Sequence, residues 1–119
     1  MENRNVIKDK SFGFAIRIVR LYQYLTSDKK EYVLSKQLLR CGTSIGANIN
    51  EALQGFTKKD FIYKLSIALK EATETQYWLA LLFNTNYLAE KEFKSLEKDI
   101  VEIIKLLTSI IKSSKVSLS

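Results

Sequence analysis

The residues of this sequence that could do chemistry are polar side chains concentrated on two stretches. The first stretch, QLLRCGTSIGANINEA at residues 37–52, contains a polar row whose members are spaced three or four apart: Gln37, Arg40, Ser44, Asn48 and Glu51. The second stretch contributes two carboxylates, Glu71 and Glu74. Residues three and four apart share one face of a helix. Such groups could bind a metal, transfer protons or form a buried polar network.

Metal binding and acid–base catalysis are both disfavoured by what the sequence lacks. Glu51, Glu71 and Glu74 could form a di-metal carboxylate cluster, but in helical bundles that architecture uses Glu-x-x-His motifs. This chain has no histidine and one cysteine. A general acid and a general base would need a pocket that holds substrate, and no sequence feature marks one. We therefore expect a protein that is not an enzyme and binds no cofactor or metal.

A buried polar network is the interpretation that these residues favour. Ser44 and Asn48 border an apolar row and should be at least half buried. An unpaired buried amide costs about 1–3 kcal/mol, so partners must be available, and Glu71 or Glu74 could supply them. The sequence thus predicts one register-fixing network that joins Glu71 or Glu74 to the whole polar row: Gln37, Arg40, Ser44, Asn48 and Glu51.

Two glycines interrupt the same stretch. Gly42 and Gly46 are four apart, hence on one face, and each should cost a helix about 1 kcal/mol relative to alanine. Their missing side chains would create a groove in which another helix can approach closely, which offsets that cost. A flexible hinge is the alternative interpretation.

Four amphipathic segments must position these groups. The 119-residue chain is 46% apolar and 27% charged, which is ordinary for a globular domain. It has no proline, which favours helices joined by short connections. Apolar residues recurring three and four apart predict helices over about residues 8–25, 29–54, 58–84 and 90–112, followed by a frayed tail at 113–119. The sequence predicts a single all-α domain over 1–119, an antiparallel up-down-up-down four-helix bundle.

Local signals mark helix ends. Asp28 with Glu31, and Thr57 with Asp60, have the spacing of a capping box, which predicts the starts of the second and third helices. Gly55 should take the left-handed conformation that often ends a helix.

More apolar surface is available than one core of four helices can hide. The first helix carries two apolar rows, one of Phe12, Ala15, Ile16, Val19 and Tyr22 and one of Phe14, Ile18, Leu21 and Leu25. The fourth helix adds four apolar residues to its core stripe: Val101, Ile104, Leu106 and Ile111. Because exposed apolar patches often mark partner contacts, we expect a homo-oligomer.

The net charge of +6 suits a polyanionic partner without identifying one. Two arginines of the first helix and lysines that cluster at the ends of the second and third helices could form a phosphate-tracking patch. These candidate nucleic-acid-binding residues are Arg17, Arg20, Lys29, Lys30, Lys36, Lys58 and Lys59. No base-reading motif is visible, so binding to RNA or DNA should be weakly sequence-specific and strongly salt-dependent. Solvated charge that keeps the surface soluble is the alternative.

Targeting signals are missing from the sequence. Cys41 is the single cysteine and cannot form an internal disulfide. No stretch resembles a signal peptide or is apolar for long enough to cross a membrane. We expect a cytoplasmic protein with no membrane partner.

The stretches SKQLLRCGTSIGANINEAL and KKDFIYKLSIALKEATETQYWLALL together resemble the four-helix-bundle proteins encoded within intervening sequences of bacterial 23S rRNA genes. The related accessory variability determinant proteins of diversity-generating retroelements share the pattern. The resemblance spans about residues 12–111. The family's polar motif maps onto the polar row and onto Glu71, Glu74 and Trp78, while Ala89 replaces the serine or threonine usual before the fourth helix.

The resemblance implies a ring-shaped homopentamer. In the retroelement branch it implies binding of nucleic acid and of a reverse transcriptase through a basic surface, and in the rRNA branch it implies a fold and a genomic setting but no established activity. Two hypotheses therefore stand. One is a non-enzymatic scaffold or accessory factor that binds nucleic acid, and the other is a structural homo-oligomer that binds a protein partner and no nucleic acid.

Overall fold

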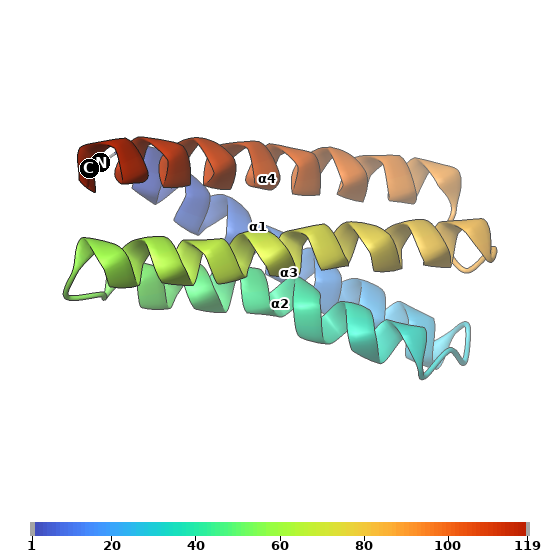
Figure 1. Cartoon of the computed structure of the whole chain (residues 1–119). Coiled ribbons are helices and arrows are strands. Elements are labelled where there is room, and N and C mark those ends of the chain that lie inside the picture. Colours follow the sequence, from blue (N-terminus) through green and yellow to red (C-terminus); the bar gives the residue numbers. More distant parts are fainter. Residues whose placement is uncertain (1, 119) are drawn as a thin grey trace.

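Four α-helices form the part of the chain described by the structure, a computed structural model, namely residues 2–118 (Figure 1). They are α1 (Glu2–Ser27), α2 (Leu34–Leu53), α3 (Lys58–Asn84) and α4 (Glu90–Leu118), and no strand occurs among these residues. α1 packs against α2 and α4, and α3 packs against the same two helices, so the four surround one core. The predicted all-α, antiparallel up-down-up-down four-helix bundle is confirmed.

The two ends of the bundle differ in what they carry. The start of α1, the end of α4 and the α2–α3 turn lie together at one end, termed the terminal end (Figure 1). The α1–α2 connection (residues 28–33) and the α3–α4 connection (residues 85–89) lie at the opposite end, termed the loop end. The long axis of the molecule measures 48 Å, so the two ends are far apart.

The core takes one apolar stripe from each helix. On α1 it is the row of Phe14, Ile18, Leu21 and Leu25. The other helices face it with buried rows that include Leu38, Ile45 and Ile49 of α2, Leu65, Leu79 and Leu82 of α3, and Leu96, Ile100, Ile103 and Leu107 of α4. Burying each such side chain contributes about 1.5–3 kcal/mol, so these rows supply most of the drive to fold.

The other apolar row of α1 faces away from the core. Phe12, Ile16 and Val19 are 66%, 39% and 38% exposed, and these three residues are termed the outer row. They line a shallow hollow of about 340 Å³. Part of the apolar excess seen in the sequence therefore lies on this face of α1, while other exposed apolar side chains, such as Val33 and Phe56, lie in the connections between helices.

α1 and α4 are both longer than predicted. α1 begins at Glu2 rather than near residue 8. α4 continues to Leu118, so residues 113–118 of the predicted frayed tail are helical, while residue 119 lies outside the described residues. Tertiary contacts account for this, since packing rather than propensity stabilises most protein helices.

Two contacts with the start of α3 hold these extensions. The Lys58 ammonium donates a hydrogen bond to the Ser117 hydroxyl near the end of α4. The Arg4 guanidinium near the start of α1 lies 4.5 Å from the centroid of the Phe61 ring, a cation–π contact.

The start of α2 differs from the predicted capping box. α2 begins at Leu34 rather than near residue 29, and Asp28 accepts a hydrogen bond from the hydroxyl of the preceding residue instead. The Glu31 carboxylate accepts three backbone N–H groups, those of Val33, Leu34 and Ser35, at 3.2, 3.0 and 2.7 Å. Although burial opposes ionisation, these hydrogen bonds hold the pKa of Glu31 below its usual range.

The turn between α2 and α3 meets one expectation and not the other. The Thr57 side chain accepts the backbone N–H of Asp60 at 3.0 Å, so the predicted cap of α3 is confirmed. The prediction for Gly55 is wrong, because no glycine among residues 2–118 has a positive φ. The left-handed residues are Lys30 and Asn86, at φ 56° and 69°, and both lie in loop-end connections.

Gly42 and Gly46 let α1 approach α2 closely, as the sequence predicts. A Cβ on Gly42 would lie 2.9 Å from both Cγ atoms of Ile18, closer than carbon atoms pack. A Cβ on Gly46 would lie 3.5 Å from two oxygens of Ser11, which is ordinary contact. α2 runs as a helix through both positions. Packing therefore requires glycine at residue 42 and only tolerates it at residue 46.

These glycines generate a matched pair of variants. For Gly42→Ala we expect a net loss of up to about 2 kcal/mol in the free energy of unfolding, because overpacking costs about 1–3 kcal/mol and helix propensity returns about 1 kcal/mol. For Gly46→Ala we expect no loss or a gain of up to about 1 kcal/mol. Urea denaturation measures both, and equal stabilities of the two variants would show that no close approach exists at Gly42.

Candidate functional site

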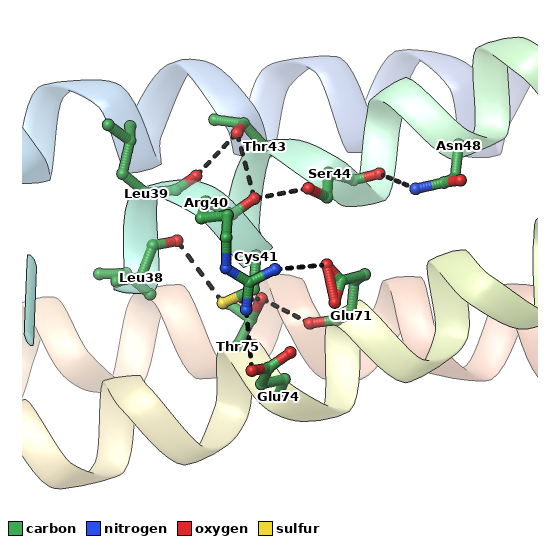
Figure 2. Close-up of polar contacts among 10 residues, drawn as sticks. All are labelled: Leu38, Leu39, Arg40, Cys41, Thr43, Ser44, Asn48, Glu71, Glu74 and Thr75. Carbon is green, nitrogen blue, oxygen red and sulfur yellow. Dashed lines mark hydrogen bonds and ion pairs between the residues drawn. The ribbon is translucent and has the colours of Figure 1, made fainter. Parts of the chain in front are cut away.

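Arg40 joins α2 to α3 through two carboxylates (Figure 2). Its Nη1 donates to Oε2 of Glu71 at 3.2 Å, and its Nη2 donates to Oε1 of Glu74 at 2.9 Å. Because Glu71 and Glu74 lie one turn apart on α3, a single planar guanidinium spans both. This arrangement is termed the Arg40 clamp.

The rest of the polar row does not reach α3 as one network. Ser44 and Asn48 are half-buried, as expected, but Ser44 donates to the Arg40 carbonyl at 2.6 Å and Asn48 to the Ser44 carbonyl at 2.8 Å, both on their own helix (Figure 2). Glu51 pairs separately with Lys64 of α3 at 3.0 Å. Gln37 is exposed. The interhelical part of the network therefore consists of the clamp and the Glu51 pair.

The two carboxylates of the clamp titrate differently. Burial and the neighbouring Glu74 carboxylate raise the pKa of Glu71 despite the opposing effect of Arg40. Burial also opposes ionisation of Glu74, but the hydrogen bonds from Arg40 and Glu71 lower its pKa. Divergent values of this kind can mark an acid–base pair. Here the Arg40 guanidinium forms ion pairs with both carboxylates. Neither Glu71 nor Glu74 lines any of five pronounced hollows formed by the described residues.

Cys41 lies buried beside the clamp. The Thr75 hydroxyl lies 3.3 Å from its Sγ, and the same hydroxyl donates to the Glu71 carbonyl at 2.7 Å (Figure 2). Burial raises the pKa of the Cys41 thiol, which keeps it protonated and poorly nucleophilic. Its place between α2 and α3 gives it a packing role.

The carboxylates considered for a metal cluster are spread over two contacts. Glu51 lies with Lys64, whereas Glu71 and Glu74 lie with Arg40. Within residues 2–118, no group of three or more acidic or cysteine side chains is arranged to hold a metal ion.

The candidate nucleic-acid-binding cations fall into two groups. Lys29, Lys30 and Lys36 lie at the loop end, and Arg17 and Arg20 lie on the half of α1 that leads to it. Lys58 and Lys59 start α3 at the terminal end. In an antiparallel bundle the starts of consecutive helices lie at opposite ends, so these cations do not form one patch.

Arg17 is taken up by ion pairs with α4. Its Nη1 lies 2.7 Å from Oδ2 of Asp99, and its Nη2 lies 3.6 Å from Oε1 of Glu92. About two turns earlier on α1, Nζ of Lys10 lies 2.8 Å from Oε2 of Glu102. These contacts tie α1 to α4 across their seam. The carboxylates neutralise the charge of Arg17, which makes it a weaker ligand for phosphate.

The remaining loop-end cations have no such partners. Arg20, Lys29, Lys30 and Lys36 are exposed and make no ion pair within the described part of the chain, and they are termed the loop-end basic surface. Two tyrosines accompany them, Tyr24 and Tyr32, which are 42% and 59% exposed. Cations interleaved with exposed aromatic rings are typical of surfaces that bind single-stranded nucleic acid.

The terminal end holds further cations that are absent from the sequence-predicted set, among them Lys112 and Lys115. Lys112 and Lys115 lie on the part of α4 nearest the chain end, and the hydrogen bond from Lys58 to Ser117 brings this part of α4 beside the start of α3. In a frayed tail these two lysines would have no defined position, whereas the helix defines where they lie. The apolar period of α4 ends at Ile110 and Ile111, so it gave no signal for the longer helix, whose end is held by the contact with the start of α3.

None of the helices described over residues 2–118 combines the length and the apolarity that crossing a bilayer requires.

Comparisons with known proteins identify relatives of the whole bundle. A sequence model of the 23S rRNA-intervening sequence protein family matches residues 3–109. The chain is also similar to a crystal structure from Bacteroides thetaiotaomicron, a protein of the S23 ribosomal protein family described as having unknown function. The two are 58% identical with a TM-score of 0.91, and the alignment covers 92% of this chain and 98% of the other. No curated protein matches.

The Arg40 clamp generates a pH-dependent prediction. For Arg40→Gln we expect a loss of about 0.5–1 kcal/mol at neutral pH, as for a partly exposed pair, because two carboxylates are left facing each other. The pKa of Glu74 is lower in the folded protein than in the unfolded chain, so its ionised carboxylate stabilises the fold above the unfolded-state pKa. This contribution is lost as the pH falls through the folded-state pKa. The stability difference between Arg40→Gln and wild type should therefore shrink below about pH 4.

Arg40→Lys, which keeps the charge, should recover part of the loss. Lys64→Gln is the matched control, since it frees one carboxylate, Glu51, rather than two. Thermal denaturation of the three variants from neutral pH to about pH 3 measures the effect. A deficit of Arg40→Gln that does not change with pH would contradict it.

Proposed function

The chain belongs to the family of 23S rRNA-intervening sequence proteins, and on that premise we propose that it is a non-enzymatic, oligomeric scaffold that binds RNA. The loop-end basic surface is the observation that carries the proposal. Its four cations are exposed and unpaired among the described residues, and Tyr24 and Tyr32 lie beside them.

The chemistry of this surface suits phosphates and unpaired bases. Lysine ammonium groups contact phosphate oxygens as point charges, and each such pairing releases condensed counterions, which makes binding salt-dependent. Exposed tyrosine rings offer faces on which bases stack. Because stacking requires bases that are not paired, RNA with single-stranded segments suits this surface better than a duplex.

Self-association is the second part of the proposal. The outer row presents three apolar side chains to solvent on one face of α1, and a second copy would cover them. The resemblance implies a homopentamer, which we carry forward as the proposed state. Encoding within an rRNA intervening sequence and a cytoplasmic location belong to the same proposal, and a retroelement setting with a reverse transcriptase partner stays a prediction.

A structural homo-oligomer that binds a protein and no nucleic acid is the second candidate. The outer row favours it, because an apolar face serves protein contact and not RNA contact. The two candidates differ in whether the loop-end cations matter.

Filter binding of a structured RNA with single-stranded loops, across a salt series, tests the proposal. For Lys29→Ala/Lys30→Ala/Lys36→Ala we expect affinity to fall and the slope of log K against log salt to decrease by about 3, because each lysine that neutralises a phosphate contributes about one to that slope. The control, Lys58→Ala/Lys59→Ala/Lys115→Ala, removes the same charge at the terminal end and should bind nearly as wild type.

Absence of RNA binding by the wild-type chain at low salt would refute the RNA-binding function and leave the protein-binding candidate. Equal losses of affinity in the two triple variants would mean that net charge, and not the loop-end basic surface, determines binding. Tighter binding to duplex DNA of the same length would replace RNA with DNA as the ligand.

Light scattering at micromolar concentration tests self-association. The wild-type chain should be an oligomer, and Phe12→Glu/Val19→Glu should be monomeric, because charges would be buried in the interface. The control, Tyr63→Glu/Tyr77→Glu, adds the same charge at exposed positions on α3 and should stay oligomeric. A monomeric wild-type chain refutes the oligomer, and an oligomeric Phe12→Glu/Val19→Glu variant places the interface elsewhere.

A further inference from the structure

Two hollows adjoin each other at the loop end of the surface. The first, of about 390 Å³, lies between the second half of α1 and the start of α4, and Leu21, Leu88 and Ala89 form its apolar wall. The second, also about 390 Å³, shares Tyr24, Leu88 and Ala89 with the first and continues to Lys29. Volumes of this size are those of small-ligand sites, and the two adjoining hollows are together termed the groove.

Three charged side chains line the first hollow, namely Arg17, Arg20 and Glu92, and Arg17 is already engaged by Glu92 and Asp99. Arg20 lines it and makes no ion pair among the described residues. Glu92 lines it from the first turn of α4, and its side chain is 51% exposed. A guanidinium offers only donors and a carboxylate only acceptors. A ligand that fits both must present acceptors next to donors.

Glu92 is positioned for this task by Arg17. The Arg17 Nη2 lies 3.6 Å from Oε1 of Glu92, while its Nη1 is fixed at 2.7 Å on Asp99. This ion pair engages one carboxylate oxygen loosely and orients the group at the rim of the hollow. The two arginines therefore have different roles, since Arg17 orients Glu92 and Arg20 keeps its donors available.

Guanine is the base that presents two adjacent acceptors beside two adjacent donor groups, so it can engage both side chains in a bidentate way. Its O6 and N7 accept hydrogen bonds from a guanidinium. Its N1–H and N2–H₂, on the adjoining edge, donate to a carboxylate. Adenine presents an unprotonated N1 where the carboxylate would lie, which places two acceptors against each other. The exposed Tyr24 ring at the shared wall supplies a stacking face, and Lys29 in the second hollow suits the attached phosphate.

We propose that the groove binds an unpaired guanine base, with Arg20 donating to O6 and N7, Glu92 accepting from N1–H and N2–H₂, and Tyr24 stacking on the ring. The proposal rests on the proposed RNA-binding function and names the base that this surface selects. The general affinity then comes from the lysines, and the preference for guanine comes from the groove.

Atom-level changes to a single base test the groove. The probe is a short uridine-rich RNA strand that carries one guanine, and its affinity is compared with strands that carry adenine, inosine or 7-deazaguanine at that position. We expect adenine to bind about tenfold more weakly or worse, because it cannot form the bidentate pair with Arg20. Inosine lacks the N2 amino group and 7-deazaguanine lacks N7, so each should lose part of the preference.

Variants distinguish the contribution of the groove to guanine preference from the contribution of the surrounding charge to overall affinity. Arg20→Lys keeps the charge but not the planar fork, so it should keep most of the affinity for the uridine-rich strand and lose the guanine preference. Glu92→Gln should also lose the preference. Glu97→Gln is the matched control, because Glu97 is exposed on the same helix and does not line either hollow. Circular dichroism verifies that all three fold.

The outcomes distinguish this proposal from the RNA-binding function. Equal affinity for the guanine and adenine strands, or a preference that survives in both Arg20→Lys and Glu92→Gln, overturns the guanine site and leaves RNA binding in place. Free guanosine monophosphate serves as a second probe against adenosine monophosphate. Selective binding of the free nucleotide without RNA binding supports the site and refutes the RNA function, whereas binding of neither probe refutes both.

Discussion

The close approach of α1 to α2 at Gly42 is the constraint on which the other surfaces depend. Ile18 lies where a side chain on residue 42 would be, so this face of α1 must point inward. Helix geometry then decides the remaining faces, because successive residues are rotated by a fixed angle. The side of α1 toward α4 receives Arg17, Arg20 and Tyr24, and the outer row is left facing solvent.

One helix therefore serves three environments. The inner row belongs to the core, the side facing α4 carries ion pairs and the groove, and the outer row is free to meet another chain. The seam between α1 and α4 is the loosest of the four helix seams and is bridged by ion pairs from Lys10 and Arg17. A seam of that kind leaves space for hollows, which explains why the groove lies there and not between α2 and α3.

Much of the fold follows from the sequence because the apolar period is a strong signal over long helices. The Arg40 clamp was predictable for the same reason, since Glu71 and Glu74 share a face of α3 that must meet α2. The hydrogen bonds of Ser44 and Asn48 to carbonyls of their own helix were not predictable. Short polar side chains compete for carbonyls of their own helix, and no feature of the sequence favours the partner helix over this local choice.

Other features needed tertiary information. Both apolar rows of α1 have the right period, and only the position of α2 decides which row is buried. The capping of α2 by Glu31 depends on the path of the loop before it. In that loop Lys30 takes the left-handed conformation, for which lysine has no special propensity, so the sequence does not predict it. The separation of Lys58 and Lys59 from the loop-end cations could have been deduced, since it follows from the predicted antiparallel order.

The difference between the loop end and the terminal end has a consequence for assemblies. In a ring with one rotation axis parallel to the bundle, every copy points the same way, so all loop ends would meet at one rim and all terminal ends at the other. Interactions that are weak in one copy would then act on the same strand at high effective concentration. Avidity of this kind raises apparent affinity by about 10²–10⁴ without any new interaction.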